Sequence, residues 1–65
     1  MTKKHFEAIA AIIKSDLDAL SDVSGPAAES AREACENIAV GMADYFASEN
    51  PRFDREKFLT ACGVV

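Results

Sequence analysis

The chain has 65 residues, a net charge of −4 and hydrophobic residues at 49% of its composition. This length accommodates one small domain, and the composition is that of a globular rather than a disordered chain. The acidic balance argues against direct binding of DNA or RNA, because such binding relies on Lys and Arg to neutralise phosphates.

The apolar segments are too short to span a bilayer, and Glu7 and Lys14 interrupt the place where a secretory signal would have its apolar core. We therefore expect a cytoplasmic protein without a membrane partner, whose two cysteines stay reduced. An amphipathic first helix lying on a membrane is an alternative that the acids in its second half disfavour.

A first helix is predicted over residues 3–20, with Thr2 as its N-cap. Its apolar residues recur at steps of three and four, which is typical of a helix that packs lengthwise on another helix. The stripe consists of Phe6, Ile9, Ala10, Ile13, Leu17 and Leu20. Ile12 lies about 100° from the centre of this stripe, so it is expected at the surface.

The segment SDVSGP breaks the periodicity, and Ser24 or Gly25 can cap a second helix over residues 26–48 that ends before Asn50-Pro51. Val40 lies off the apolar stripe of this helix. The stripe predicted to face the core comprises Ala27, Ala31, Ala34, Cys35, Ile38, Met42, Tyr45 and Phe46. Folding at the turn would place Leu17 and Leu20 near Ala27 and Ala31, and Phe6 near Tyr45 and Phe46, as in an antiparallel hairpin.

A short third helix is predicted over residues 55–62, with Asp54 as its N-cap and Gly63 just after its end. Phe53 and Phe58 stand at the two positions of a hydrophobic staple. Phe58, Leu59 and Cys62 share a face, so this segment is expected to form a structural lid over the open end of the hairpin. The predicted fold is all-α: a single domain with an antiparallel two-helix hairpin, closed by a short C-terminal third helix.

The C-terminal stretch NPRFDREKFLTACG and the N-terminal HFEAIAAII resemble a group of short proteins from bacteriophage, prophage and other bacterial genomes. The resemblance covers both ends of the chain, and the middle differs. It implies a small, phage-encoded accessory protein of the bacterial cytoplasm that acts by binding a host protein.

Catalytic chemistry is not expected, because His5, Cys35 and Cys62 are the only histidine and cysteines and show no orienting partner. A structural zinc site usually needs four Cys or His ligands, so no metal or cofactor is predicted. Cys35 and Cys62 are interpreted as small core residues, and a disulfide between them is the disfavoured alternative.

Apolar residues outside the two stripes indicate an interface, because so small a core gains from self-association into a helical bundle dimer. The candidate interface comprises Ile12 and Val40, which lie outside the stripes, and Ile9 of the first stripe, which could widen the apolar surface, with Asp16, Asp18 and Asp22 as an acidic rim. The predicted function is that of a non-catalytic protein-interaction module, which binds and inhibits or redirects a bacterial host protein. Two alternatives stay open: a structural or assembly protein acting as a homo-oligomer, and an acidic DNA mimic.

Overall fold

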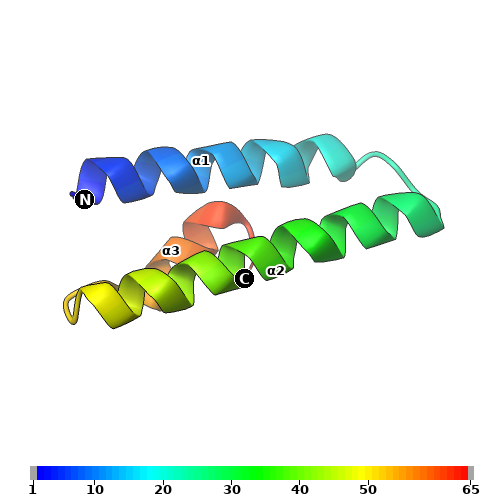
Figure 1. Ribbon diagram of the computed structural model, residues 1–65. Helices are drawn as coiled ribbons and strands as arrows, with labels where there is room; N and C mark the ends of the chain where they lie inside the picture. Colours follow the sequence, from blue (N-terminus) through cyan, green and yellow to red (C-terminus); the bar gives the residue numbers. More distant parts are fainter. Residues whose placement is uncertain (1, 65) are drawn as a thin grey trace.

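The computed structural model describes residues 2–64, and three helices account for most of them (Figure 1). They are α1 (Lys3–Leu20), α2 (Pro26–Glu49) and α3 (Arg55–Cys62). The predicted ranges are confirmed, except that α2 continues one residue further than expected. The molecule measures 39 × 18 × 16 Å, so the two long helices set its length.

The two long helices run antiparallel, and α3 packs against both of them at the end away from the turn (Figure 1). The C-terminal end of α3 reaches the middle of α1, where Lys14 and Leu17 lie within 4.0 Å of the position that a Cβ on Gly63 would take. This arrangement confirms the predicted hairpin closed by a third helix. It also leaves the turn end of the hairpin as a two-helix structure.

The N-termini of the long helices follow from local sequence. Thr2 is the N-cap of α1, and its backbone N–H donates to Nδ1 of His5 across 3.1 Å. Gly25 is the N-cap of α2 at a φ of 112°, which a side chain would strain, and Pro26 occupies the first turn. The hairpin turn therefore ends at Gly25, and α2 begins at Pro26.

The predicted boundaries of α3 are confirmed by its hydrogen bonds. Asp54 Oδ1 accepts a bond from the backbone N–H of Lys57 at 3.0 Å, which satisfies a donor that the helix itself leaves free. Gly63 has a φ of 85°, and it donates to the Thr60 carbonyl while Val64 donates to the Leu59 carbonyl. This pair of bonds is the Schellman motif that ends a helix at a glycine.

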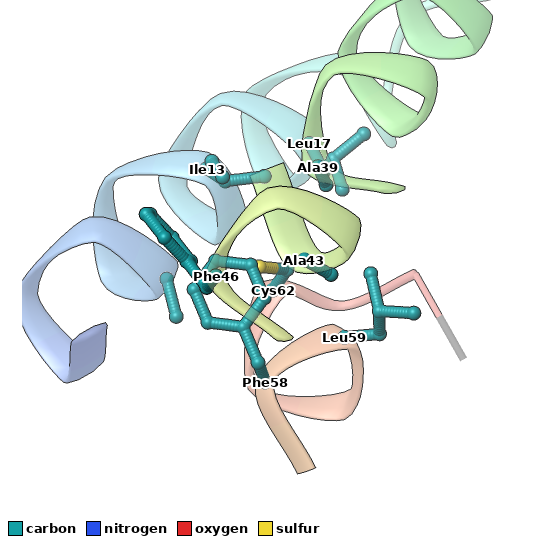
Figure 2. Close-up of a cluster of buried hydrophobic side chains, with 9 residues drawn as sticks. Ile13, Leu17, Ala39, Ala43, Phe46, Phe58, Leu59 and Cys62 are labelled. Carbon is teal, nitrogen blue, oxygen red and sulfur yellow. The ribbon is translucent and has the colours of Figure 1, made fainter. Parts of the chain in front are cut away.

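All three helices contribute to one hydrophobic core (Figure 2). The buried residues are Ala10, Ile13 and Leu17 of α1, Ala39, Ala43 and Phe46 of α2, and Phe58, Leu59 and Cys62 of α3. Ala39 and Ala43 of α2 and Cys62 of α3 are fully buried at 0% exposure, so small side chains occupy the most enclosed part of the core. The predicted face of α3 is confirmed.

Phe46 is the centre of an aromatic cluster that joins the open end of the hairpin to α3. Its ring centroid lies 4.9 Å from that of Phe6, 5.5 Å from that of Phe53 and 5.6 Å from that of Phe58. Phe53 and Phe58 are themselves 5.5 Å apart, which confirms the predicted staple. These tilted and edge-on pairings are the favourable aromatic geometries.

The core-facing stripe predicted for α2 is confirmed for Phe46, which is buried, and for Cys35 and Met42, which pack against the core, but it is wrong for the other five members. The residues that the structure leaves exposed are Ala27, Ala31, Ala34, Ile38 and Tyr45, and the buried ones are Ala28, Ala39, Ala43 and Phe46. In particular Ala28, rather than Ala27 or Ala31, is the buried alanine near the turn. The reason is that α2 packs against two helices at once, and its alanines let α1 and α3 approach on a face that carries few large residues.

Candidate functional site

Ile12 is the most exposed large hydrophobic residue that the structure describes, with 66% of its surface accessible. Lys14 and Leu17 mark the side of α1 that faces the end of α3. At about 100° per residue, Ile12 lies about 170° from that side of the helix. The candidate anchor therefore lies on the side of α1 that α3 leaves uncovered.

Asp16 follows Ile12 by one helical turn and lies on the same side of α1. Its carboxylate is close enough to Cys35 of α2 to affect that thiol. Burial is the main reason that the pKa of Cys35 is raised, and the negative charges of Asp16 and then Glu36 raise it further. Asp16 thus lies near Cys35 of α2.

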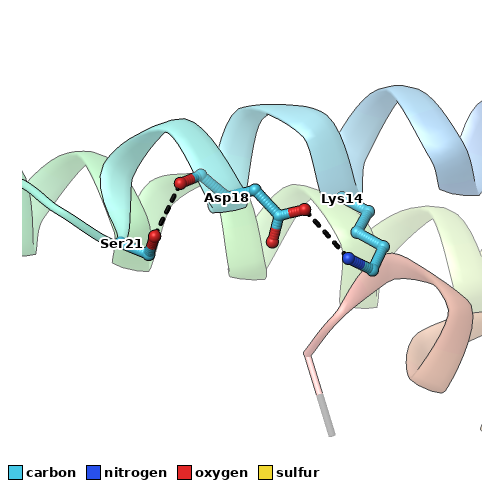
Figure 3. Close-up of polar contacts among 3 residues, drawn as sticks. All are labelled: Lys14, Asp18 and Ser21. Carbon is cyan, nitrogen blue, oxygen red and sulfur yellow. Dashed lines mark hydrogen bonds and ion pairs between the residues drawn. The ribbon is translucent and has the colours of Figure 1, made fainter.

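Asp18 lies elsewhere on the surface, because two residues along a helix correspond to a rotation of about 200°. Its Oδ2 accepts a bond from Lys14 Nζ at 2.9 Å, and its backbone carbonyl accepts one from Ser21 Oγ (Figure 3). Asp22 is exposed in the turn. The structure brings Asp16, but not Asp18, to the side of Ile12.

Ile9 and Val40 are half-buried and pack against the hydrophobic core. The expectation that Val40 stands free on the surface is therefore wrong, because α2 presents a different face to the core than the sequence pattern indicated. Part of each side chain is still accessible, so their contribution to an interface stays a prediction. Of the three candidate apolar residues, only Ile12 is exposed.

A second apolar surface, which we call the α2 seam, follows the outer side of α2. It consists of Ala27, Ala31, Ala34, Ile38, Gly41 and Tyr45, all of them exposed. Ile38 and Tyr45 each expose 60% of their surface. The steps of four and three residues that led to its interpretation as a core stripe are the signal that identifies it. Sequence reasoning found these residues, except Gly41, but predicted that they face the core, whereas the structure leaves them exposed.

A groove of about 490 Å³ lies between α1 and α3. The aromatic side chains of Phe6, Phe53 and Phe58 line it, together with charged residues of both signs; these are Lys3, Glu7, Arg52, Asp54 and Lys57. Asp54 is already engaged as the cap of α3. The mixed charges give this groove no net preference for a strongly charged ligand.

Of the residues that sequence reasoning considered for catalysis, Cys35 and Cys62 both contribute to the core, whereas His5 lies at the surface at the start of α1. Cys62 is fully buried, Cys35 is half-buried, and both are free thiols. His5 is exposed and bonds locally to Thr2 at the start of α1. Within residues 2–64, His, Cys, Asp and Glu side chains nowhere gather in the groups of three that could hold a metal ion.

Comparisons of the chain with protein-family models, with curated proteins and with solved structures give no match. In the part of the chain that the structure describes, every helix is too short or too polar to cross a membrane. The surfaces themselves therefore carry the functional argument.

Proposed function

We propose that the protein is a non-catalytic protein-interaction module, a phage-type accessory protein that binds a bacterial host protein in the cytoplasm and inhibits or redirects it. The observation that carries this proposal is Ile12, which exposes 66% of its surface on the side of α1 away from α3. An isolated exposed aliphatic residue needs no explanation, but Ile12 has the exposed Ala8 and the half-buried Ile9 within one turn of it on α1. The resemblance to short phage proteins supports a bacterial partner.

The surroundings of Ile12 define the chemistry of the partner. Asp16 lies one turn away and Ile9, half-buried, borders the same side. An apolar anchor beside a carboxylate is complementary to an apolar pocket with a Lys or Arg at its rim. We expect Ile12 to supply most of the binding energy and Asp16 to increase the association rate, with a dependence on salt.

The two alternatives differ in what supports them. A role as a homo-oligomer is favoured by the α2 seam. DNA mimicry needs a regular array of carboxylates, and Asp16 and Asp18 point to different sides of α1. We therefore keep host-protein binding as the main proposal.

The test is an affinity capture of the tagged protein from nuclease-treated bacterial lysate, read by mass spectrometry. The informative variant is Ile12→Glu, and the matched control is Val23→Glu, which introduces the same charge at an aliphatic residue that is 50% exposed in the turn. Val40 is left unchanged, because a glutamate there would disturb the core. Circular dichroism confirms that both variants retain their helices.

A host protein captured by the wild type and by Val23→Glu, but not by Ile12→Glu, is the expected result. It is then purified and its binding measured directly at two salt concentrations, with Asp16→Asn expected to reduce the salt dependence. Capture that is equal for all three proteins, or recovery of the tagged protein alone, contradicts the proposal.

A further inference from the structure

The α2 seam is an apolar face without a partner within residues 2–64, and of the acidic residues of α2 only Glu49, one turn after Tyr45, lies on the same side of the helix. The seam contains no charged residue, although 28% of the chain is charged. Glu29, Glu33 and Glu36 follow the far side of α2, about 150° round the helix from the seam. Asp44, at its edge, accepts a bond from Arg55 Nε at 2.6 Å. An acidic protein can thus approach this face without strong like-charge repulsion.

The sizes of the seam residues are self-complementary about residue 36, with the large residues on one side of it and alanines at the matching positions on the other. Ala34 and Ile38 are equally far from this position, as are Ala31 and Gly41, and so are Ala27 and Tyr45. We propose that the α2 seam binds the same seam of a second copy of the chain, antiparallel and about a two-fold axis at residue 36. In this arrangement Ile38 meets Ala34 of the second copy, and Tyr45 meets its Ala27.

The antiparallel arrangement is favoured over a parallel one by side-chain size. A parallel pair in register would place Ile38 on Ile38 and Gly41 on Gly41, so that contacts between large residues hold the backbones apart at the small ones. The antiparallel pair instead places each large residue against an alanine, as close packing requires. A two-fold interface of this kind uses the same patch of both copies.

Gly41 supports a close approach of the second copy. Glycine is unfavourable inside a helix, and within its own chain nothing lies within 4 Å of the position that a Cβ on Gly41 would take. Packing inside the chain therefore gives no reason for a glycine there. Opposite Ala31 of a second copy, its missing side chain lets the two helix backbones approach.

The expected dimer is reversible, because the seam is only ~27 Å long at about 1.5 Å per residue. Interfaces at the small end of the range are weak, so we expect a dissociation constant on the order of 10 µM. The dimer does not depend on a host partner, since it uses α2 and leaves the Ile12 side of α1 accessible.

The first experiment measures the molar mass of the untagged protein by sedimentation equilibrium from micromolar to millimolar concentration. The wild type is expected to change from the monomer mass of 7.0 kDa to twice that value. Ile38→Glu and Ala34→Glu, both at exposed positions, are expected to remain monomeric and helical. Ile12→Glu is the matched control and is expected to dimerise like the wild type. A monomeric wild type at every concentration, or equal dissociation by Ile12→Glu, overturns the proposal.

The second experiment tests the orientation in a Cys35→Ala background by cross-linking introduced cysteines with a short bismaleimide, which spans more than the Cα separation of about 7 Å that limits a disulfide. A cysteine replacing Asn37 would lie within ~3 Å of its counterpart along the helix axis, whereas one replacing Ser48 would lie ~36 Å from its counterpart. Covalent dimers are expected with Asn37→Cys and not with Ser48→Cys. Cross-linking at position 48 as efficient as at position 37 would instead show a parallel pair and refute the antiparallel seam.

Discussion

Arg32 of α2 donates a hydrogen bond from Nη2 to the backbone carbonyl of Leu20, the last residue of α1, across 2.9 Å. Carbonyls in the last turn of a helix have no partner within that helix, and they carry its partial negative charge. The Leu20 carbonyl accepts from the Val23 backbone N–H at 3.1 Å, and the guanidinium from the neighbouring helix adds a second bond and complements the charge. This bond joins α1 to α2 at the turn end, beyond the reach of α3.

Replacing Arg32 is therefore expected to destabilise the protein. Arg32→Ala removes a part-buried, charge-assisted bond and should lower the free energy of unfolding by about 1–2 kcal/mol. Arg32→Lys should restore only part of this loss, because an ammonium does not reproduce the geometry of the guanidinium. Urea unfolding followed by circular dichroism measures the difference. The control is Arg52→Ala, which removes an exposed arginine and should change the free energy of unfolding by less than about 0.5 kcal/mol. Equal effects of the two alanine variants would contradict a stabilising role of the bond from Arg32 to Leu20.

The cap of α3 makes a separate prediction. Asp54→Ala leaves the Lys57 N–H without its acceptor and should cost about 1 kcal/mol. For a domain of this size such a loss lowers the melting temperature by roughly 4–8 °C. Asp54→Ser keeps an oxygen in the same place, so thermal unfolding should show a much smaller shift. A serine variant as unstable as the alanine variant would argue that the carboxylate acts in some other way.

Phe46 is expected to be the most sensitive position in the chain. Its ring contacts Phe6, Phe53 and Phe58, and a Phe→Ala change in a core typically costs about 3–5 kcal/mol. That loss is comparable to the whole stability that so small a core provides. Phe46→Ala should therefore lose most of its helical circular dichroism at 25 °C, while Phe46→Leu, which keeps most of the volume, should remain folded. A cooperatively folded alanine variant would show that the aromatic cluster matters less than its geometry implies.

The two thiols should differ in reactivity and respond to pH in a defined direction. The thiolate is the reactive form, and the pKa of each cysteine is raised mainly by burial, with nearby charge adding to the shift at Cys35. Both cysteines should therefore react slowly at neutral pH, and Cys35 should react first because Cys62 is fully buried. Asp16→Asn removes one of the charges, lowers the pKa of Cys35 and should accelerate its labelling. Labelling kinetics read by intact-protein mass spectrometry provide the measurement, and an unchanged rate in Asp16→Asn would contradict the assigned cause.

The same shifts affect stability. The raised pKa of Cys62 means that the native protein favours the protonated thiol. The stability that the protonated Cys62 thiol contributes is fully present below the pKa of this thiol in the unfolded chain. It is lost as pH rises through the higher pKa of the native protein. The free energy of unfolding should thus fall in alkaline solution, and Cys62→Ala should reduce that fall. Urea titrations across the alkaline range test the sign.

Sequence reasoning succeeded where the determinants are local. The helix bounds, the Asp54 cap, the Phe53–Phe58 staple and the turn at Gly63 each depend on residues only a few positions apart. The side of α2 that faces the core could not be predicted from local sequence, because the apolar residues of this helix occupy a wide arc. That arc contains two stripes whose residues are spaced equally regularly. Only the position of α3 shows that the stripe with Ala39 and Ala43 is buried. The bond from Arg32 to Leu20 also depends on the register of two helices, and so it escaped prediction.

The partial cover that α3 provides divides the molecule into two regions of unequal local stability. At the open end, backbone amides lie beneath three packed helices and an aromatic cluster, and their exchange with deuterium requires most of the structure to open. Near the turn, the helices are joined by Ala28, the Arg32 bond and few other buried groups. Opening there exposes little apolar surface and costs correspondingly little free energy. We therefore expect native-state fluctuations to begin at the turn and to spread toward α3, so that the short helix is the element that keeps the two long ones together.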